Sequence, residues 1–250
     1  MRTSELFLST AMLLCLSLPA AAQSEGGLVA GAEAEKKLSK EWSIGLEADL
    51  RTRNDFKTLD RWGFGLGASY KINKYLKADA GYKLLDYNFR EKVSYKTSGD
   101  LNHWRPSYWG VKHRFHAGLT GSYKFSSGIK VSLRERWQYS YRPEKTVSRW
   151  DFDEETWEDK ARAAKAKNQL RSRLEVSYDR KRALFTPFAS VELYNAWSIE
   201  KIRYTVGADI RLTKRHTLEA FYRFQNMKNV DEDDYDPDMH FLGVGYKFKF

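Results

Sequence analysis

The sequence predicts an all-β protein, an antiparallel transmembrane β-barrel of ten to twelve strands, for which eleven candidate segments can be counted. Apolar and polar residues alternate with period two through most of the chain, and the connections between segments alternate between short and long. The chain also ends in an amphipathic segment that closes on Phe250. Because successive side chains of a strand point to opposite faces, each segment has one apolar and one polar face, as membrane barrels require.

The first residues are predicted to be an export signal and no part of the fold. Arg2 supplies a positive charge, the stretch from Leu6 to Leu18 is mainly apolar, and Ala20 to Ala22 form a small-residue cleavage site. A membrane-spanning helix would need about 20 apolar residues, and this run is shorter. We therefore expect a cleaved signal peptide over residues 1–22 and an outer-membrane β-barrel over residues 23–250.

Composition excludes several classes of protein. The only cysteine, Cys15, lies inside the predicted signal, so the mature chain would hold no disulfide, thiolate nucleophile or cysteine metal site. No second apolar run exists, which excludes a helical membrane protein. The formal net charge is +10, and in an exported protein this indicates a basic lumen or attraction to anionic lipid and polysaccharide.

The segment over 42–51 shows the alternation most clearly. Its apolar face carries Trp42, Ile44, Leu46, Ala48 and Leu50, and its polar face carries Ser43, Gly45, Glu47, Asp49 and Arg51. The other candidate strands lie at about 28–37, 63–72, 76–84, 114–124, 129–139, 170–178, 184–195, 202–212, 217–226 and 240–250. Helix is expected only at 154–167, where Glu, Asp, Lys and Ala dominate.

The connections support a barrel over a soluble sandwich. Short turns are expected at 39–40, 73–74, 126–128, 179–182 and 213–216, and longer loops at 54–61, 86–109, 142–167, 196–201 and 228–238. Outer-membrane barrels have short periplasmic turns and long extracellular loops. Greek-key crossings give a sandwich no reason to alternate in this way.

Aromatic residues gather near the predicted strand ends, where interfacial girdles are expected. They are Trp42, Tyr75, Tyr123, Phe125, Tyr178 and Phe248 near short turns or the terminus, and Trp62, Tyr139 and Tyr141 near the loops. The alternative is that they are core aromatics of a soluble β-protein. Tyr246, Phe248 and Phe250 are predicted to form the C-terminal signal that the barrel-insertion machinery recognises.

The strand count conflicts with the even numbers usual in bacterial single-chain barrels. If Phe250 lies in the periplasm, an eleventh strand would begin outside the cell. We therefore expect either ten strands, with the first segment incomplete, or twelve, with one segment still to be found. The sequence leaves both open.

Five stretches carry a resemblance to a known family. They are Leu28 to Leu38, Leu46 to Arg51, Asp60 to Trp62, Gly67 to Lys71 and Ala80 to Lys83. In them the chain resembles the uncharacterised outer-membrane barrel family called domain of unknown function 2490, which is common in Bacteroidetes. The similarity extends over nearly the whole mature chain, and it implies a fold and a location without bringing catalytic residues.

Charged side chains occupy the predicted inward faces, and we take them as candidates for lining the lumen. The basic candidates are Arg51, Arg53, Lys83, Lys112, Arg114, Arg134, Arg136, Arg171, Arg173, Arg203, Arg211 and Arg223. The acidic ones are Glu47, Asp49, Asp79, Glu175, Glu192, Asp209 and Glu219. They could form an ion-paired plug in place of an apolar core, or a narrow, porin-like passage that prefers anions because basic groups outnumber acidic ones.

The histidines raise the question of an enzyme, since some barrels are lipases or proteases. They lie at 103, 113, 116, 216 and 240, but the sequence has no Gly-x-Ser-x-Gly or His-Glu-x-x-His motif. His113 falls in the outward register and His116 in the inward one, so they would not converge. We expect no enzyme, with a barrel-embedded hydrolase or lipid-modifying enzyme and a soluble ligand-binding barrel as the alternatives.

Two predicted loops have unusual composition. Asp231 to Asp238 contains six carboxylates, which suit calcium, although the spacing lacks the Gly and distal Glu of an EF-hand and the ordinary interpretation is a solvated loop. The loop over 142–167 places Trp150, Phe152 and Trp157 among charges. It could cover the pore or contact a partner, or be a mobile external loop.

The sequence therefore predicts an outer-membrane barrel of a Gram-negative-type cell, with its long loops extracellular. The predicted role is structural or the passive passage of small, anion-preferring solutes, without cofactor or metal. The expected partners are outer-membrane lipid and, through the C-terminal strand, the barrel-insertion machinery. Nucleic acid is not expected, because export and the period-two register argue against it.

Overall fold

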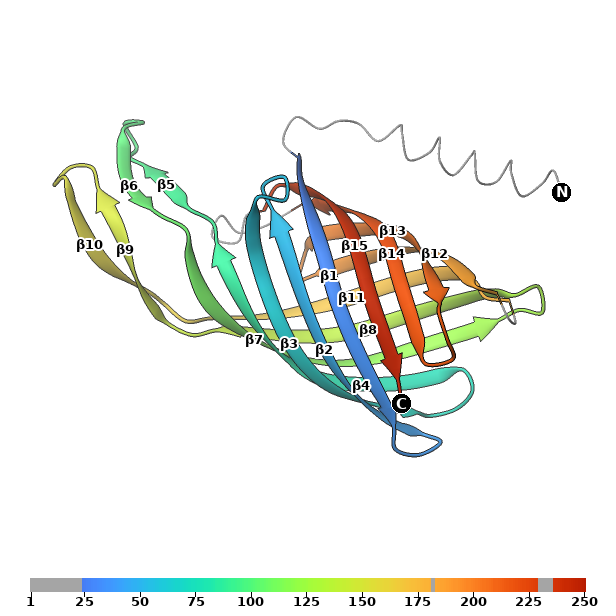
Figure 1. Cartoon of the computed structure of the whole chain (residues 1–250). Coiled ribbons are helices and arrows are strands. Elements are labelled where there is room, and N and C mark those ends of the chain that lie inside the picture. The colour runs from blue at the N-terminus through green and yellow to red at the C-terminus, as the bar shows by residue number, and fades with distance from the viewer. Residues whose placement is uncertain (1–23, 181–182, 229–235) are drawn as a thin grey trace, which may run out of the picture.

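The computed structural model describes residues 24–180, 183–228 and 236–250, and within these ranges the fold is built from β-strands (Figure 1). Eleven of the described strands form one closed barrel, which confirms the predicted fold class. In chain order they are β1 (Ser24–Lys37), β2 (Trp42–Arg53), β3 (Thr58–Lys71), β4 (Leu76–Phe89), β7 (Tyr108–Lys124), β8 (Ile129–Arg142), β11 (Lys165–Tyr178), β12 (Phe185–Asn195), β13 (Ile199–Arg211), β14 (His216–Met227) and β15 (Asp238–Lys249). In this part of the chain no helix has the length and apolar content needed to cross a membrane.

The barrel closes through one parallel pair. Neighbouring strands are antiparallel all round the wall except at β1 and β15, which pair in parallel from Ser24 opposite Asp238 to Glu35 opposite Lys249. The argument from parity for ten or twelve strands is therefore wrong, and the described residues close the barrel with the eleven strands counted in the sequence. An up-and-down barrel with an odd number of strands brings its first and last strands together in parallel, and their ladder pairs the backbone groups that an open edge would expose.

Two of the expected loops are hairpins that lie beyond the barrel wall. β5 (Lys92–Tyr95) and β6 (Leu101–Arg105) lie between β4 and β7, and β9 (Lys145–Asp151) and β10 (Thr156–Arg162) lie between β8 and β11. They form a separate four-stranded sheet in the order β10-β9-β6-β5, which projects beyond one rim of the barrel (Figure 1). We call it the distal sheet.

The helix expected at 154–167 is wrong, because this stretch contains β10 and the start of β11. Cross-strand pairing explains the difference. Trp157 lies opposite Trp150, and Glu158 lies opposite Arg149, so an aromatic pair and an ion pair favour the hairpin. Such tertiary contacts commonly override the weak preference of Glu, Lys and Ala for helix.

Two other connections are shorter than expected. β3 already begins at Thr58 and β13 at Ile199, so tight turns at 54–57 and 196–198 replace the predicted loops at 54–61 and 196–201. The short turns predicted at 39–40, 73–74, 126–128 and 213–216 are present at the opposite rim, and residues 181–182 of the one predicted at 179–182 lie outside the described residues. In one of them the side-chain oxygen of Asn73 accepts hydrogen bonds from the backbone of Tyr75 and Leu76, at 2.8 and 2.9 Å.

The two faces of the wall differ as the alternation predicts. Large apolar side chains cover the outer face, where Leu66 is 56% exposed in the isolated chain, whereas the inward Leu85 is fully buried. Aromatic pairs lie along the short-turn rim, among them Trp42 with Tyr70 at 4.9 Å and Tyr75 with Tyr123 at 5.8 Å between ring centroids. An apolar outer face bordered by aromatic rings is what a bilayer requires.

Candidate functional site: the barrel lumen

Glycines on β3 make room for long side chains inside the barrel. A side chain at Gly63 would meet Lys83 of β4, and one at Gly65 would meet Glu47 of β2. Because β3 has no side chains at these two positions, the Lys83 side chain reaches across β3. Its ammonium group pairs with Glu47 at 3.0 Å and with Asp49. The lumen is thus filled by side chains that join strands that are not neighbours in the sheet.

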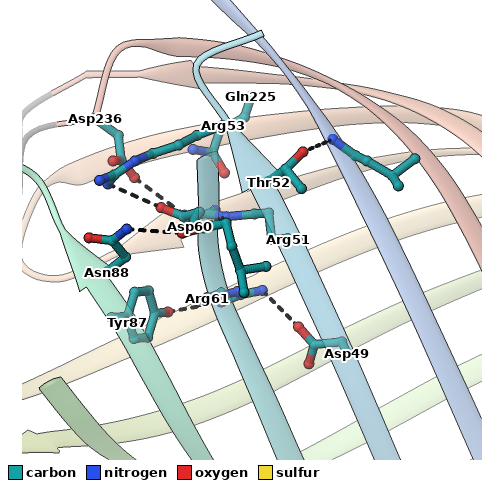
Figure 2. A network of polar contacts seen from close by, with 12 residues as sticks. Asp49, Arg51, Thr52, Arg53, Asp60, Arg61, Tyr87, Asn88, Gln225 and Asp236 are labelled. Carbon is teal, nitrogen blue, oxygen red and sulfur yellow. Dashed lines mark hydrogen bonds and ion pairs between the residues drawn. The ribbon is translucent and has the colours of Figure 1, made fainter. Parts of the chain in front are cut away.

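A bulge determines the polar contacts near the distal rim. Thr52 pairs with Leu59 and Arg51 with Arg61, which leaves Asp60 as an extra residue on β3. A bulge of this kind redirects a side chain, and here both Asp60 and Arg61 point into the lumen (Figure 2).

Asp60 is the centre of this rim network and is only 2% exposed. Its carboxylate accepts a hydrogen bond from Arg51 at 2.5 Å and one from Arg53 at 3.4 Å, and Arg51 also lies 3.7 Å from Asp236 (Figure 2). A buried carboxylate between two buried guanidinium groups compensates their charge, which joins β2 to β3 and to the segment before β15.

Tyr87 connects the rim network to the middle of the lumen. Its hydroxyl accepts a hydrogen bond from Arg61 at 2.8 Å (Figure 2). It accepts another from Arg114 at 3.1 Å. Arg61 also lies 3.4 Å from Asp49 on the other side. One phenol oxygen thus orients two cations of different strands.

On the other side of the lumen, Glu192 of β12 binds arginines from several strands. Arg134 of β8 and Arg171 of β11 each donate to its carboxylate at 2.9 Å, as does the hydroxyl of Tyr194 at the same distance. Arg203 of β13 lies 4.0 Å away. Glu192 is 7% exposed, so one buried carboxylate compensates several buried cations.

Further ion pairs continue toward the short-turn rim. Asp79 accepts from Arg136 at 2.8 Å and lies 3.4 Å from His116. Lys247 pairs with Glu219 at 2.6 Å and with Asp209 at 3.1 Å. Charged contacts therefore extend along the length of the interior.

A cavity of about 700 Å³ lies between these side chains. In the described part of the chain, twenty Lys and Arg residues and nine Asp and Glu residues line it, an excess of eleven basic groups. The whole chain has an excess of ten. The net positive charge of the protein is thus concentrated in the lumen, while the rest of the molecule is close to neutral.

Most residues predicted to line the lumen lie on this cavity. They are Arg51, Arg53, Lys83, Lys112, Arg114, Arg134, Arg136, Arg171, Arg173, Arg203, Arg223, Glu47, Asp49, Glu192 and Glu219. Asp79 and Asp209 lie beside it through the ion pairs already described, and Glu175 pairs with Arg173 at 2.5 Å. Arg211 lies elsewhere, near the short-turn rim, 3.9 Å from Asp179.

Sequence reasoning missed several lining residues. Lys167, Lys201 and Lys247 follow the same period-two register as their predicted neighbours, so that register was a sufficient signal for them. Asp60 and Arg61 gave no such signal, because they are adjacent and only the bulge turns both inward.

The histidines are dispersed over the barrel. His113, His216 and His240 contact tyrosine hydroxyls on the outer register, at 2.8, 2.5 and 2.6 Å. His116 lies in the lumen and His103 on the distal sheet. Of the possible calcium loop, residues 231–235 lie outside the described residues, as does the predicted signal peptide over 1–22.

Comparison with known proteins gives the family. The model of the family described as "Protein of unknown function (DUF2490)" matches residues 30–236, which is most of the chain. The chain belongs to the DUF2490 family. This agrees with the resemblance found in the sequence. No protein with a curated description matches this DUF2490 chain.

Solved structures give the fold of this DUF2490 barrel. The β-domain of the Bordetella autotransporter Brka is similar with a TM-score of 0.51 and 14% identity, over 92% of this chain and 100% of that one. The CymD monoaromatic hydrocarbon channel is similar with a TM-score of 0.41 and 10% identity, over 78% of this chain and 66% of that one. The first likeness, at this level of identity, shows a shared outer-membrane barrel fold.

Proposed function

We propose that this DUF2490 barrel passes small anionic solutes across the outer membrane. The observation that carries the proposal is the lumen cavity of about 700 Å³ with its excess of eleven basic side chains. Basic rings in a narrow pore favour anions, because each anion exchanges its hydration for contacts with fixed cations. The passage is passive, and involves no covalent step, cofactor or metal.

The arrangement of the lumen suits conduction of anions. Several guanidinium groups share each buried carboxylate, as Arg134 and Arg171 share Glu192, so cationic charge remains uncompensated. The Nε atoms of Arg134, Arg136 and Arg173 are buried without a hydrogen-bond partner. An anion that enters the lumen would accept hydrogen bonds from these donors. Because donors are distributed along the lumen, the anion can leave one site and bind at the next.

The cavity also extends along most of the barrel, as the proposed passage needs. Near the distal rim it is lined by Arg90, Lys92 and Asp236, and toward the other rim by Glu33 of β1 and Lys247 of β15. Lys247 lies two residues before the end of β15 at Lys249. The lined space thus reaches from the rim that bears the distal sheet almost to the opposite rim.

The location belongs to the same proposal. We place the barrel in the outer membrane, with the distal sheet outside the cell and the short turns in the periplasm, as is usual for barrels whose connections differ in length. Insertion would use the last strand, where the rings of Phe248 and Phe250 meet edge to face with their centroids 4.5 Å apart. No catalytic role or nucleic acid partner is part of this proposal.

The test is conductance of the purified full chain in planar bilayers. Across a gradient of potassium chloride, the reversal potential should have the sign of chloride selectivity. Replacing Arg114→Gln together with Arg223→Gln removes two lumen charges and should shift the reversal potential toward zero. Lys214→Gln together with Arg215→Gln, in the turn between β13 and β14, removes two exposed charges outside the lumen and serves as the matched control.

Two results would overturn the proposal. One is cation selectivity of the native chain. The other is a lack of conductance from protein whose heat-modifiable gel migration shows that it is folded. That result would mean that the ion-paired side chains form a plug and exclude solutes.

A further inference from the structure

The two hairpins of the distal sheet meet at a very short ladder. β6 and β9 pair at two positions, His103 opposite Asp151 and Trp104 opposite Trp150. By contrast, β9 and β10 pair at seven positions within their own hairpin. The junction is therefore weak in backbone hydrogen bonds, and its side chains decide whether the hairpins stay together.

Three side chains with metal-binding groups converge on one face of this junction. The Nε2 atom of His103 lies 3.2 Å from a carboxylate oxygen of Asp151 and 3.3 Å from one of Glu158. The three ligand atoms lie within 4.8 Å of one another, and all three residues are partly buried. They come from β6, β9 and β10, so both hairpins contribute.

Asp151 is held in position by its own backbone. One of its oxygens accepts hydrogen bonds from the backbone N–H groups of Asp153 at 2.8 Å and Glu154 at 3.2 Å. The other oxygen is directed at His103. The two N–H donors hold the pKa of the Asp151 carboxyl below its usual range.

We propose that His103, Asp151 and Glu158 bind a divalent transition-metal ion of the zinc class, which fastens the two hairpins together. One imidazole nitrogen with two carboxylate oxygens is a ligand set that zinc accepts, whereas calcium takes six to eight oxygens. With metal–ligand bonds of about 2.0–2.2 Å, ligand atoms on a tetrahedral ion lie about 3.3 Å apart. The two distances from His103 have this value.

The local charge favours a cation here, although the lumen favours anions. Acidic residues dominate the tip of the distal sheet, namely Asp100, Asp151, Asp153, Glu154, Glu155, Glu158 and Asp159, against Lys96, Arg149 and Lys160. The sign of the charge thus reverses between the lumen and the tip. This separation makes the metal site independent of the proposed passage.

Arg149 is the competitor for the site. Its guanidinium pairs with the same oxygen of Glu158 that faces His103. A metal ion must displace this contact, so Arg149 weakens the site. Arg149→Gln should therefore bind the ion more tightly than the native chain.

The experiment uses the purified full chain in detergent, with zinc and then cobalt as probes. Equilibrium dialysis should find one zinc ion per chain, and cobalt should give the visible absorption of a tetrahedral site. His103→Ala should lose both signals. Asp159→Asn is the matched control. The neighbouring Asp159 carboxylate accepts a hydrogen bond from Ser148 and is not among the proposed ligands, so this variant should leave both signals unchanged.

A second readout reports the proposed fastening. Trp104 and Trp150 lie at the same junction, so zinc should alter tryptophan fluorescence and slow proteolysis of the hairpins in the native chain but not in His103→Ala. All variants should retain heat-modifiable migration, since the distal sheet lies outside the barrel wall. Absence of zinc uptake by the native chain, or uptake that His103→Ala leaves unchanged, would overturn the proposal.

Discussion

Phe221 lies over Gly243 inside the barrel. The two residues are directly opposite each other on β14 and β15, and a side chain at position 243 would overlap the Phe221 ring. The ring thus covers a stretch of backbone that has no side chain of its own. Gly243 lies on β15, the strand that pairs in parallel with β1, and Phe221 lies on the neighbouring strand β14, so this packing supports the strand that closes the barrel.

Gly243→Ala should destabilise the barrel, because the added methyl group forces the Phe221 ring out of place. Overpacking of this kind costs about 1–3 kcal/mol. The urea concentration at which heat-modifiable migration is lost should fall. Gly121→Ala is the control, since open space surrounds a side chain there, and its midpoint should equal that of the native chain. Equal urea midpoints for Gly243→Ala and Gly121→Ala would contradict the close packing of Phe221 on Gly243.

Glu192→Gln should be more damaging. The substitution removes the charge that compensates Arg134 and Arg171, and breaking a buried ion pair costs about 3–5 kcal/mol. Glu175→Gln is the comparison, because Glu175 pairs with Arg173 and its side chain is more exposed than that of Glu192. Urea unfolding should separate the two variants, and an equal loss would show that the Glu192 cluster has no special weight.

Tyr87→Phe should have a smaller effect. It removes one hydroxyl that accepts from Arg61 and Arg114, while the charge of both arginines stays the same. Loss of a buried hydrogen-bond partner costs about 1–3 kcal/mol. We expect a urea midpoint between those of Glu192→Gln and the native chain. A midpoint at the native value would mean that water replaces the hydroxyl.

A disulfide should report the parallel closure. Ala30 of β1 lies opposite Val244 of β15, and the only native cysteine lies in the predicted signal. The double variant Ala30→Cys with Val244→Cys should cross-link on mild oxidation, as seen by altered migration of the boiled chain. Ala30→Cys with Leu242→Cys is out of register and should cross-link less. A barrel closed without β1 would cross-link neither pair.

The sequence by itself determined the wall of the barrel. The alternation over 42–51 is a local property of the chain, since period two places Trp42 and Leu46 on the lipid face and Glu47 and Arg51 in the lumen whichever strands are neighbours. For the same reason the register located about half of the charged residues that line the cavity. The family was indicated separately, by the resemblance of five stretches of the sequence to its members.

Only the tertiary structure decided the closure, the distal sheet and the inward turn of Asp60. Each depends on a partner far away in the chain: β15 for β1, β9 for β6, and the register of β2 for the bulge in β3. A local pattern states which face a residue takes on a strand, but it does not state which strand pairs with it. Pairing is chosen by backbone hydrogen bonds and side-chain contacts between distant segments, and these exist only once the chain has folded.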